Sequence, residues 1–176
     1  GAWVGMTALS EVVESSATVN IDAINAHTAE WKNANDVHLL TGYSAPADGL
    51  HYRWPDLPSL RIESRLQDKL AAVAAFAQVN SIDRTVIESS QAHVGIVTAG
   101  KAHHDLMEVF RRLGLTDSAL AAAGVRVLKL GLTYPIDTVR MHNFTDGLRE
   151  VLVIEEKAPV VEQQLRDLLY NASSRP

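Results

Sequence analysis

The sequence predicts an α/β domain that combines a mainly parallel sheet with helices on both of its faces. From residue 93 onward, three apolar runs alternate with three segments of helical pattern, and this alternation is typical of parallel sheets. Hydrophobic residues make up 47% of the chain and charged residues 21%, so a sizeable core is expected. We expect right-handed connections between the parallel strands.

Three elements are expected before residue 82. Residues 4–15 have the apolar spacing of a helix, and residues 17–21 alternate enough for a short strand. Residues 59–80 give the clearest helical pattern, with Ser59 placed to cap the helix and Glu63 suited to its positive end. The apolar stripe of this helix consists of Leu66, Leu70, Val73, Ala74 and Ala77.

The remaining elements are short and alternate in type. Strands are expected at residues 85–88, 93–98, 125–130 and 150–154, the first of them at a sheet edge. Helices are expected at about 102–113, from Asp117 to Gly124, from Asp137 or Thr138 to Gly147, and from Pro159 onward. Their buried faces are expected to include Leu106, Phe110 and Leu113 in the first helix and Val161, Leu165, Leu168 and Leu169 in the last.

The net charge of −5 belongs entirely to the first third of the chain. Residues 1–58 contain seven acidic residues, two basic residues and all three tryptophans, whereas the rest of the chain is neutral. A pI of about 5.8 disfavours nucleic acid as a partner held by bulk positive charge. No run of 18 apolar residues and no secretory signal is present, so we expect a cytoplasmic protein without a membrane span. The absence of cysteine excludes disulfides and cysteine-ligated metal clusters within these residues.

Four regions are expected along the chain. Residues 1–22 form a leading segment, and residues 23–58 a linker, because glycines and prolines occur there without a sustained helical or alternating period. Trp31 and Trp54 are candidate anchors of this linker on a surface. Residues 59–81 form a connecting helix, and residues 82–176 form the α/β domain. Since the chain begins with glycine rather than methionine, we expect an internal piece of a longer protein.

The carboxyl ends of the parallel strands are the expected binding edge, because ligands of such sheets sit there. The candidate residues of this strand-end surface or anion site are Gly100, Lys101, Tyr134, Glu155 and Glu156. Residues 95–101 satisfy the first seven positions of a phosphate-binding P-loop, but Ala102 replaces the hydroxyl residue of the eighth. Residues 96 and 97 also belong to the expected strand, so a P-loop is not expected. A weaker anion site at the start of the following helix stays open.

No catalytic set and no metal site can be assembled from the sequence. His103 and His104 are neighbours on a helix, so their side chains point about 100° apart and cannot chelate one metal ion. We expect both on a solvated helix face. Glu155 and Glu156 are either functional or simply solvated. We therefore expect no catalytic residue and no metal ligand in this chain.

Several segments, in order and spacing, resemble the indolepyruvate ferredoxin oxidoreductases, and more specifically the long fused form found in bacteria. The segments that carry the resemblance are residues 95–101, 127–135, 151–157, 162–163 and 168–171, with 3–6, 7–16 and 53–56 upstream. Ala102 and His103 depart from the pattern of the family, and residues 23–49 match it only loosely.

The resemblance implies a parent enzyme that uses thiamine diphosphate with Mg²⁺ to decarboxylate a 2-oxo acid. Electrons would then pass through iron–sulfur clusters to ferredoxin, and coenzyme A would take the acyl group. Residues from about 82 onward are similar to the transketolase C-terminal domain, a three-layer α/β/α Rossmann-like fold. In that fold, residues 85–89 form an antiparallel edge strand, and a further strand is expected after Asn171. Residues 1–22 would be the tail of a preceding pyrimidine-binding domain.

The resemblance also implies that the parent enzyme has several domains and that its cofactors bind outside this chain. Its expected partners are its own other domains, ferredoxin and coenzyme A, and it is expected to be a homo-oligomer. This chain lacks the Gly-Asp-Gly and downstream Asn of thiamine diphosphate sites; Ala47-Asp48-Gly49 is the nearest match. We therefore expect no cofactor and no activity in this chain alone.

Two alternatives stay open. The chain could be a nucleotide- or coenzyme A-binding regulatory module built on the turn at Gly100 and Lys101. It could also be a non-catalytic domain of a related enzyme acting on pyruvate or 2-oxoglutarate.

Overall fold

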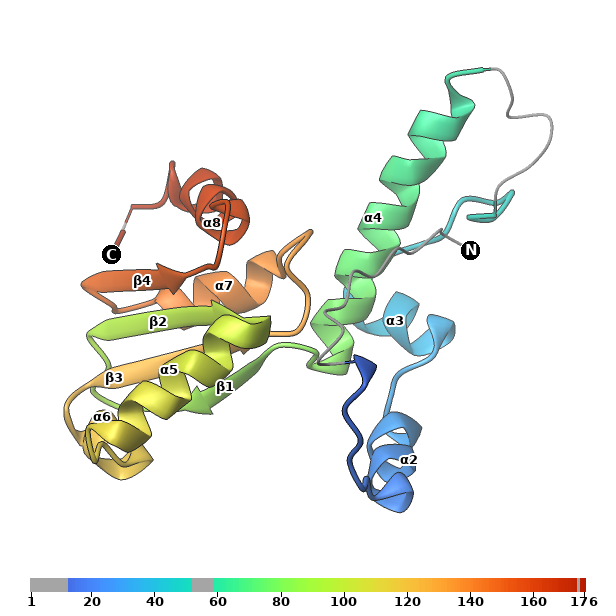
Figure 1. The fold of residues 1–176 in the computed structure, drawn as a ribbon. Coiled ribbons are helices and arrows are strands. Elements are labelled where there is room, and N and C mark those ends of the chain that lie inside the picture. Colours follow the sequence, from blue (N-terminus) through green and yellow to red (C-terminus); the bar gives the residue numbers. More distant parts are fainter. Residues whose placement is uncertain (1–12, 52–58, 174) are drawn as a thin grey trace. The chain divides into compact units, whose positions relative to one another are not determined.

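The computed structural model describes residues 13–51, 59–173 and 175–176, and only the backbone of residues 27–29 (Figure 1). The chain divides into two compact units, residues 1–72 and 73–176. The predicted helix at 4–15 lies mostly outside the described residues, and so does Trp54. No helix among the described residues is long and apolar enough to cross a membrane.

The first unit contains two short helices, α2 (Ile21–Ala29) and α3 (Ala34–Thr41). The strand predicted at residues 17–21 is wrong, because Asn20 caps α2 by accepting the backbone N–H of Ala23 at 3.1 Å. A capping box starts α3: Asn33 Oδ1 accepts the N–H of Asp36 at 3.2 Å, and Asp36 Oδ2 accepts the N–H of Asn33 at 3.2 Å. Both helices lie largely within the predicted linker 23–58, so this segment is not continuously irregular.

The predicted long helix is confirmed as α4 (Arg61–Asn80), which runs from the first unit into the second. Ser59 Oγ accepts the backbone N–H of Arg61 at 3.3 Å, close to the predicted cap. The predicted apolar stripe is wrong in part, because Leu66 and Val73 are 48% and 40% exposed. Arg65 is buried instead, since its guanidinium donates to the Gly49 carbonyl at 2.6 Å and to Asp48 Oδ2 at 3.0 Å.

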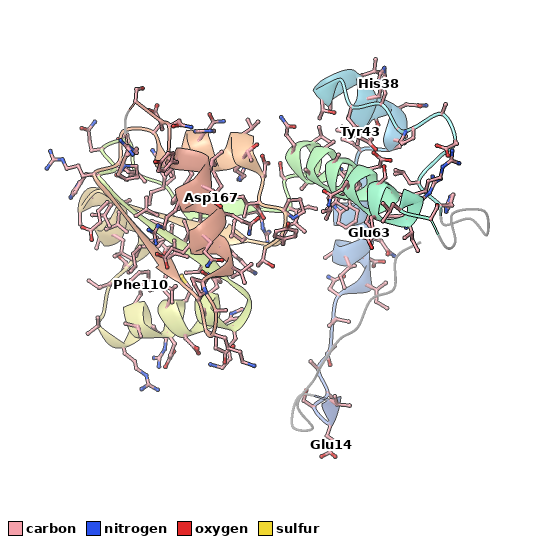
Figure 2. The ribbon with its side chains drawn as sticks, turned by 90° about the horizontal axis from the view of Figure 1, so that it is seen from above. Glu14, His38, Tyr43, Glu63, Phe110 and Asp167 are labelled. Atoms are coloured by element: carbon pink, nitrogen blue, oxygen red, sulfur yellow. The ribbon has the colours of Figure 1, made fainter. Side chains whose placement is uncertain are left out.

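A further contact within the first unit joins Tyr43 to α4. The Tyr43 hydroxyl donates to the carbonyl of Asp68 at 3.4 Å. Tyr43 is labelled in Figure 2. Trp31, a predicted anchor, is 46% exposed.

The second unit is built on a four-stranded sheet. Its strands are β1 (Arg84–Ile87), β2 (Val94–Ala99), β3 (Val125–Leu130) and β4 (Glu150–Ile154), in the order β1-β3-β2-β4. The central strand β2 pairs in parallel with both β3 and β4, and β1 pairs antiparallel with β3 at the edge. The predicted mainly parallel sheet with one antiparallel edge strand is therefore confirmed.

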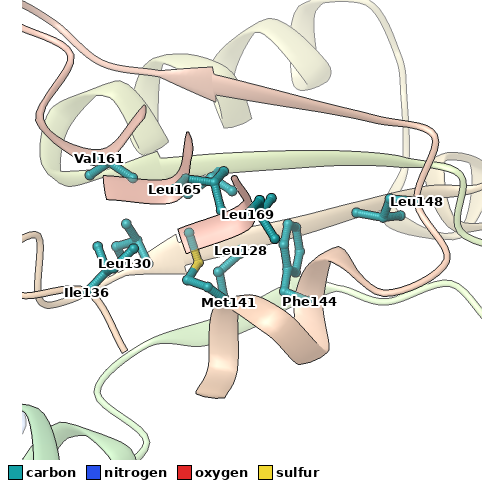
Figure 3. Packing of buried hydrophobic residues seen from close by; sticks show 10 residues of the cluster. Leu128, Leu130, Ile136, Met141, Phe144, Leu148, Val161, Leu165 and Leu169 are labelled. Carbon is teal, nitrogen blue, oxygen red and sulfur yellow. The ribbon is translucent and has the colours of Figure 1, made fainter. Parts of the chain in front are cut away.

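Helices cover both faces of this sheet, as predicted for a three-layer α/β/α fold. On one face, α5 (Gly100–Arg112) and α6 (Asp117–Ala122) pack over a cluster formed by Ile87, Ile96, Phe110, Leu120 and Val127. On the other face, α7 (Thr138–Thr145) and α8 (Val160–Leu169) enclose a larger cluster (Figure 3). Its members are Val97, Leu128, Leu130, Ile136, Met141, Phe144, Leu148, Val161, Leu165 and Leu169.

Local differences from the predictions concern helix ends and faces. Of the two residues expected to open α7, Asp137 caps the helix by accepting the N–H of Arg140 at 3.1 Å, and Thr138 is its first residue. The helix expected from Asp117 begins there as α6, and its cap is Thr116, because the Thr116 hydroxyl accepts the N–H of Ala119 at 3.2 Å. Leu113 follows the last residue of α5, is 67% exposed and is not part of the buried face of that helix.

Candidate functional site

The predicted strand-end surface lies at one edge of the sheet. β2, β3 and β4 are parallel and in register, with Thr98 opposite both Lys129 and Ile154, so their carboxyl ends meet. The chain leaves β2 toward the face covered by α5, and it leaves β3 and β4 toward the opposite face. Such a change of direction between neighbouring strands marks the position where open α/β sheets form a crevice.

Gly100 and Lys101 begin α5 at this edge. Gly100 has φ +51°, and a Cβ there would meet nothing within 4 Å, so glycine is needed for the left-handed conformation rather than for space. The Lys101 ammonium is exposed and pairs with the carboxylate of Asp105 one turn later. Hydrogen bonding to Asp105 raises the pKa of Lys101, and Glu156 adds to the effect. The positive charge of Lys101 is therefore largely matched by acidic neighbours.

Glu155 has a structural partner within the domain. Its Oε1 accepts the backbone N–H of Val161 at 2.8 Å, and its Oε2 accepts that of Glu162 at 3.1 Å. The carboxylate at the end of β4 thus caps the N-terminus of α8. Glu156 and Tyr134 are exposed at the same edge, Tyr134 to 58%.

The expected absence of a P-loop follows from the pairing of β2. Ile96 and Val97 are buried in this central strand, which is paired on both sides. Their backbone groups therefore belong to the sheet and cannot form a phosphate-binding loop.

His103 is a residue that the sequence interpretation placed wrongly. Its side chain is 7% exposed, and its Nδ1 lies 3.0 Å from the hydroxyl oxygen of Thr98 in β2. Burial lowers the pKa of His103, and the neighbouring Lys129 and His104 lower it further. His104 is exposed, as predicted. The spacing of His103 with Phe110, two turns later on the same buried face, is the signal that could have shown its burial.

Asp83 is a second residue that sequence reasoning missed. It is 2% exposed, and its Oδ1 accepts the N–H of Gly131 at 2.8 Å and of Leu132 at 3.1 Å. This carboxylate fixes the loop that leaves β3 and leads to Tyr134. Burial raises the pKa of Asp83, while the two amide hydrogen bonds oppose the shift. Nothing in the sequence around Asp83 indicates this long-range contact.

The described residues were compared with what the cofactors of the implied parent enzyme need. Within the described ranges, no three or more His, Cys, Asp or Glu side chains come together in a way that could hold a metal ion. Asp48, in the tripeptide nearest to a thiamine diphosphate motif, is ion-paired with Arg65. The sequence has no cysteine for an iron–sulfur cluster.

A hollow of about 590 Å³ lies beside β4 and α8. Its lining includes Val151, Leu165, Tyr170 and Arg175. None of the five predicted site residues lines it.

A family model described as the indolepyruvate oxidoreductase domain matches residues 84–176. Indolepyruvate oxidoreductase subunit IorA of Thermococcus kodakarensis is 33% identical over 99 residues, which are 56% of this chain and 14% of that protein. The same subunit of Methanothermobacter thermautotrophicus is 31% identical over 101 residues, 57% of this chain and 15% of that protein.

Among solved structures, a 2-oxoglutarate:ferredoxin oxidoreductase from Magnetococcus marinus aligns with 77% of this chain and 22% of its own, at a TM-score of 0.41 and 18% identity. This likeness is too low to carry an argument. The matched part of the chain spans about a seventh of the length of the curated relatives. Because the family model covers more than half of the chain, from the first residue of β1 to Pro176, the chain belongs to the indolepyruvate oxidoreductase family.

Proposed function

We propose that residues 84–176 are a structural and assembly domain of a thiamine diphosphate-dependent 2-oxoacid:ferredoxin oxidoreductase. The parent enzyme would oxidatively decarboxylate aryl 2-oxo acids such as indolepyruvate, reduce ferredoxin through iron–sulfur clusters and transfer the acyl group to coenzyme A. The observation that carries the proposal is the family match, which begins at Arg84, the first residue of β1, and covers the whole sheet.

The geometry of the strand-end edge supports a structural role. Glu155 holds the start of α8, and Lys101 is paired with Asp105, so two of the five predicted site residues already have partners within the domain. In this proposal the chain alone is inactive, and the other domains of the parent hold thiamine diphosphate, Mg²⁺ and the clusters. The parent is a cytoplasmic homo-oligomer.

The alternative of a nucleotide- or coenzyme A-binding module at Gly100 and Lys101 has less support. It needs the charge of Lys101 for a phosphate, whereas Asp105 and Glu156 surround that ammonium with negative charge. The alternative of a pyruvate- or 2-oxoglutarate-specific parent has less support from the sequence relatives, which are indolepyruvate oxidoreductase subunits.

Calorimetry tests the proposed inactivity. Titration of this chain with thiamine diphosphate and Mg²⁺ should give no saturable heat, and titration with coenzyme A should likewise show no site dependent on Lys101. Tight, Mg²⁺-dependent binding of thiamine diphosphate would overturn the proposal.

Complementation tests the assembly role. A family member that lacks the segment matching residues 84–176 should fail to assemble in sedimentation and should lose ferredoxin reduction. Addition of this chain should restore both, at least in part. Full assembly and activity without the segment would contradict the role.

A further inference from the structure

Two basic side chains lie directly opposite each other on neighbouring strands. In the antiparallel pairing of β1 with β3, Arg84 is the register partner of Lys129. Directly opposite residues project from the same face of a sheet, with Cβ atoms about 4.5–5.5 Å apart. Like charges in this arrangement repel each other, so the pair destabilises the sheet unless an anion compensates it.

The described part of the chain provides no such anion. No carboxylate within it lies within 4.0 Å of the charged nitrogens of Arg84 or Lys129. The nearest acidic residue in sequence, Asp83, directs its carboxylate to the amides of Gly131 and Leu132. Glu88, which follows β1, lies 2.6 Å from Arg126 Nε.

The start of α5 adds positive potential at the same edge. Lys129 is in register with Thr98 of β2, and Thr98 contacts His103 in the first turns of α5, so Lys129 belongs to the face that α5 covers. The cap residue of α5, Ala99, offers no side-chain acceptor to the first amides of the helix. The N-terminus of a helix carries about half a positive charge. Burial is the main cause of the lowered pKa of His103, and the positive charge of Lys129 lowers it further, which places the Lys129 ammonium near this imidazole.

We propose that Arg84 and Lys129, together with the first turn of α5, bind a phosphate-type oxyanion, either free or as the phosphoryl group of a larger molecule. A tetrahedral dianion can accept two hydrogen bonds from the flat Arg84 guanidinium and a third from the Lys129 ammonium. The basic side chains of this site differ from Lys101, which lies in the same first turn of α5 but whose charge Asp105 already matches.

NMR titration of the complete chain tests this site. Inorganic phosphate, added at constant ionic strength, should shift the His103 imidazole signals in a saturable way and should raise the His103 pKa, because the anion offsets the charge of Lys129. Arg84→Ala and Lys129→Ala should each weaken phosphate binding about tenfold or more. Arg112→Ala is the matched control, since this arginine pairs with Glu108 at the far end of α5. It should leave the affinity unchanged.

A parallel titration with ATP distinguishes the source of the phosphoryl group. ATP binding at least about tenfold tighter than phosphate would indicate a larger phosphorylated ligand, and equal affinity would indicate the free anion; both support the site. If Arg84→Ala does not fold, Lys129→Gln provides the test through thermal stability. Phosphate should then raise the Tm of the unaltered chain but not that of the variant. An equal response to chloride, or equal weakening by Arg112→Ala, would overturn the proposal.

Discussion

Gly131 packs against Ile82 so closely that a side chain at position 131 has no space. A Cβ built there would lie 2.7 Å from the carbonyl oxygen of Ile82 and 2.6 Å from its Cγ2. The carbonyl oxygen is a backbone atom, so it cannot move away without shifting the chain that enters β1. The segment before β1 and the loop after β3 are therefore in close backbone contact at the strand-end edge.

Substitution Gly131→Ala should destabilise the second unit by about 1–3 kcal/mol, because the added methyl group overpacks this contact. Urea unfolding followed through the amide NMR signals of β2 and β3 measures the loss. The matched control is Gly147→Ala, which also costs stability because φ is +73°, but where a Cβ would meet nothing within 4 Å. Only Gly131→Ala should also speed hydrogen exchange at Leu132, whose amide depends on Asp83. Equal exchange in both variants would contradict the contact.

Removal of the Asp83 carboxylate should lower the unfolding free energy of the second unit. Asp83→Ala leaves the amides of Gly131 and Leu132 without their acceptor, so a loss of about 1–2 kcal/mol in unfolding free energy is expected. Asp83→Asn keeps an oxygen that can accept from both amides. Its loss of unfolding free energy at pH 7 should therefore be clearly smaller than that of Asp83→Ala. Its amide nitrogen would replace Oδ2, a buried atom without a hydrogen-bond partner in the described part of the chain. Equal losses in the two variants would show that the hydrogen bonds contribute little.

Asp83 should also give the stability an unusual dependence on pH. Burial is the largest cause of its raised pKa; Asp137 adds to it, and the amides of Gly131 and Leu132 and the charge of Arg140 oppose it. The folded state therefore binds the proton more tightly than the unfolded state, and stability falls as pH rises from the ordinary aspartate value through the raised one. Asp83→Asn does not titrate in this range, so the unaltered chain should lose unfolding free energy relative to this variant as the pH rises. A constant difference would mean that Asp83 titrates alike in both states.

Strand β2 could be predicted from the sequence because it is a mostly buried apolar run bounded by turn residues, and the other strands because each is a short stretch rich in aliphatic residues, although β1 and β4 are partly exposed. The helices α2 and α3 could not, because Ile21, Ile24, Leu39 and Leu40 are more than half exposed and form no buried stripe. Local caps at Asn20 and Asn33 start these helices instead. The hydroxyl of Thr98, which contacts His103, belongs to another element, so in the sequence only the spacing of His103 with Phe110 indicates that His103 is buried.

The position of the candidate site could be predicted because parallel strands carry their carboxyl ends to one edge. Some contacts at this edge join residues close in sequence, and others join residues of distant strands. The pairing of Lys101 with Asp105 follows from helical spacing and was available in the sequence. The pair of Arg84 and Lys129 depends on the register of β1, which is shifted by an irregularity between Thr85 and Ile87, and no local pattern reveals it.

The last prediction concerns the cap of α8. Glu155→Ala removes the carboxylate that accepts the amides of Val161 and Glu162, so a loss of about 1–2 kcal/mol is expected, as for other helix caps. Glu155→Gln keeps an acceptor but removes the charge beside the positive helix end, and about half of that loss should remain. Hydrogen exchange at the amides of Val161 and Glu162 gives the local readout. Glu156→Ala, at the exposed neighbour, is the control and should leave those amides unchanged. If Glu156→Ala accelerates their exchange as much as Glu155→Ala does, the effect is general electrostatics rather than the cap.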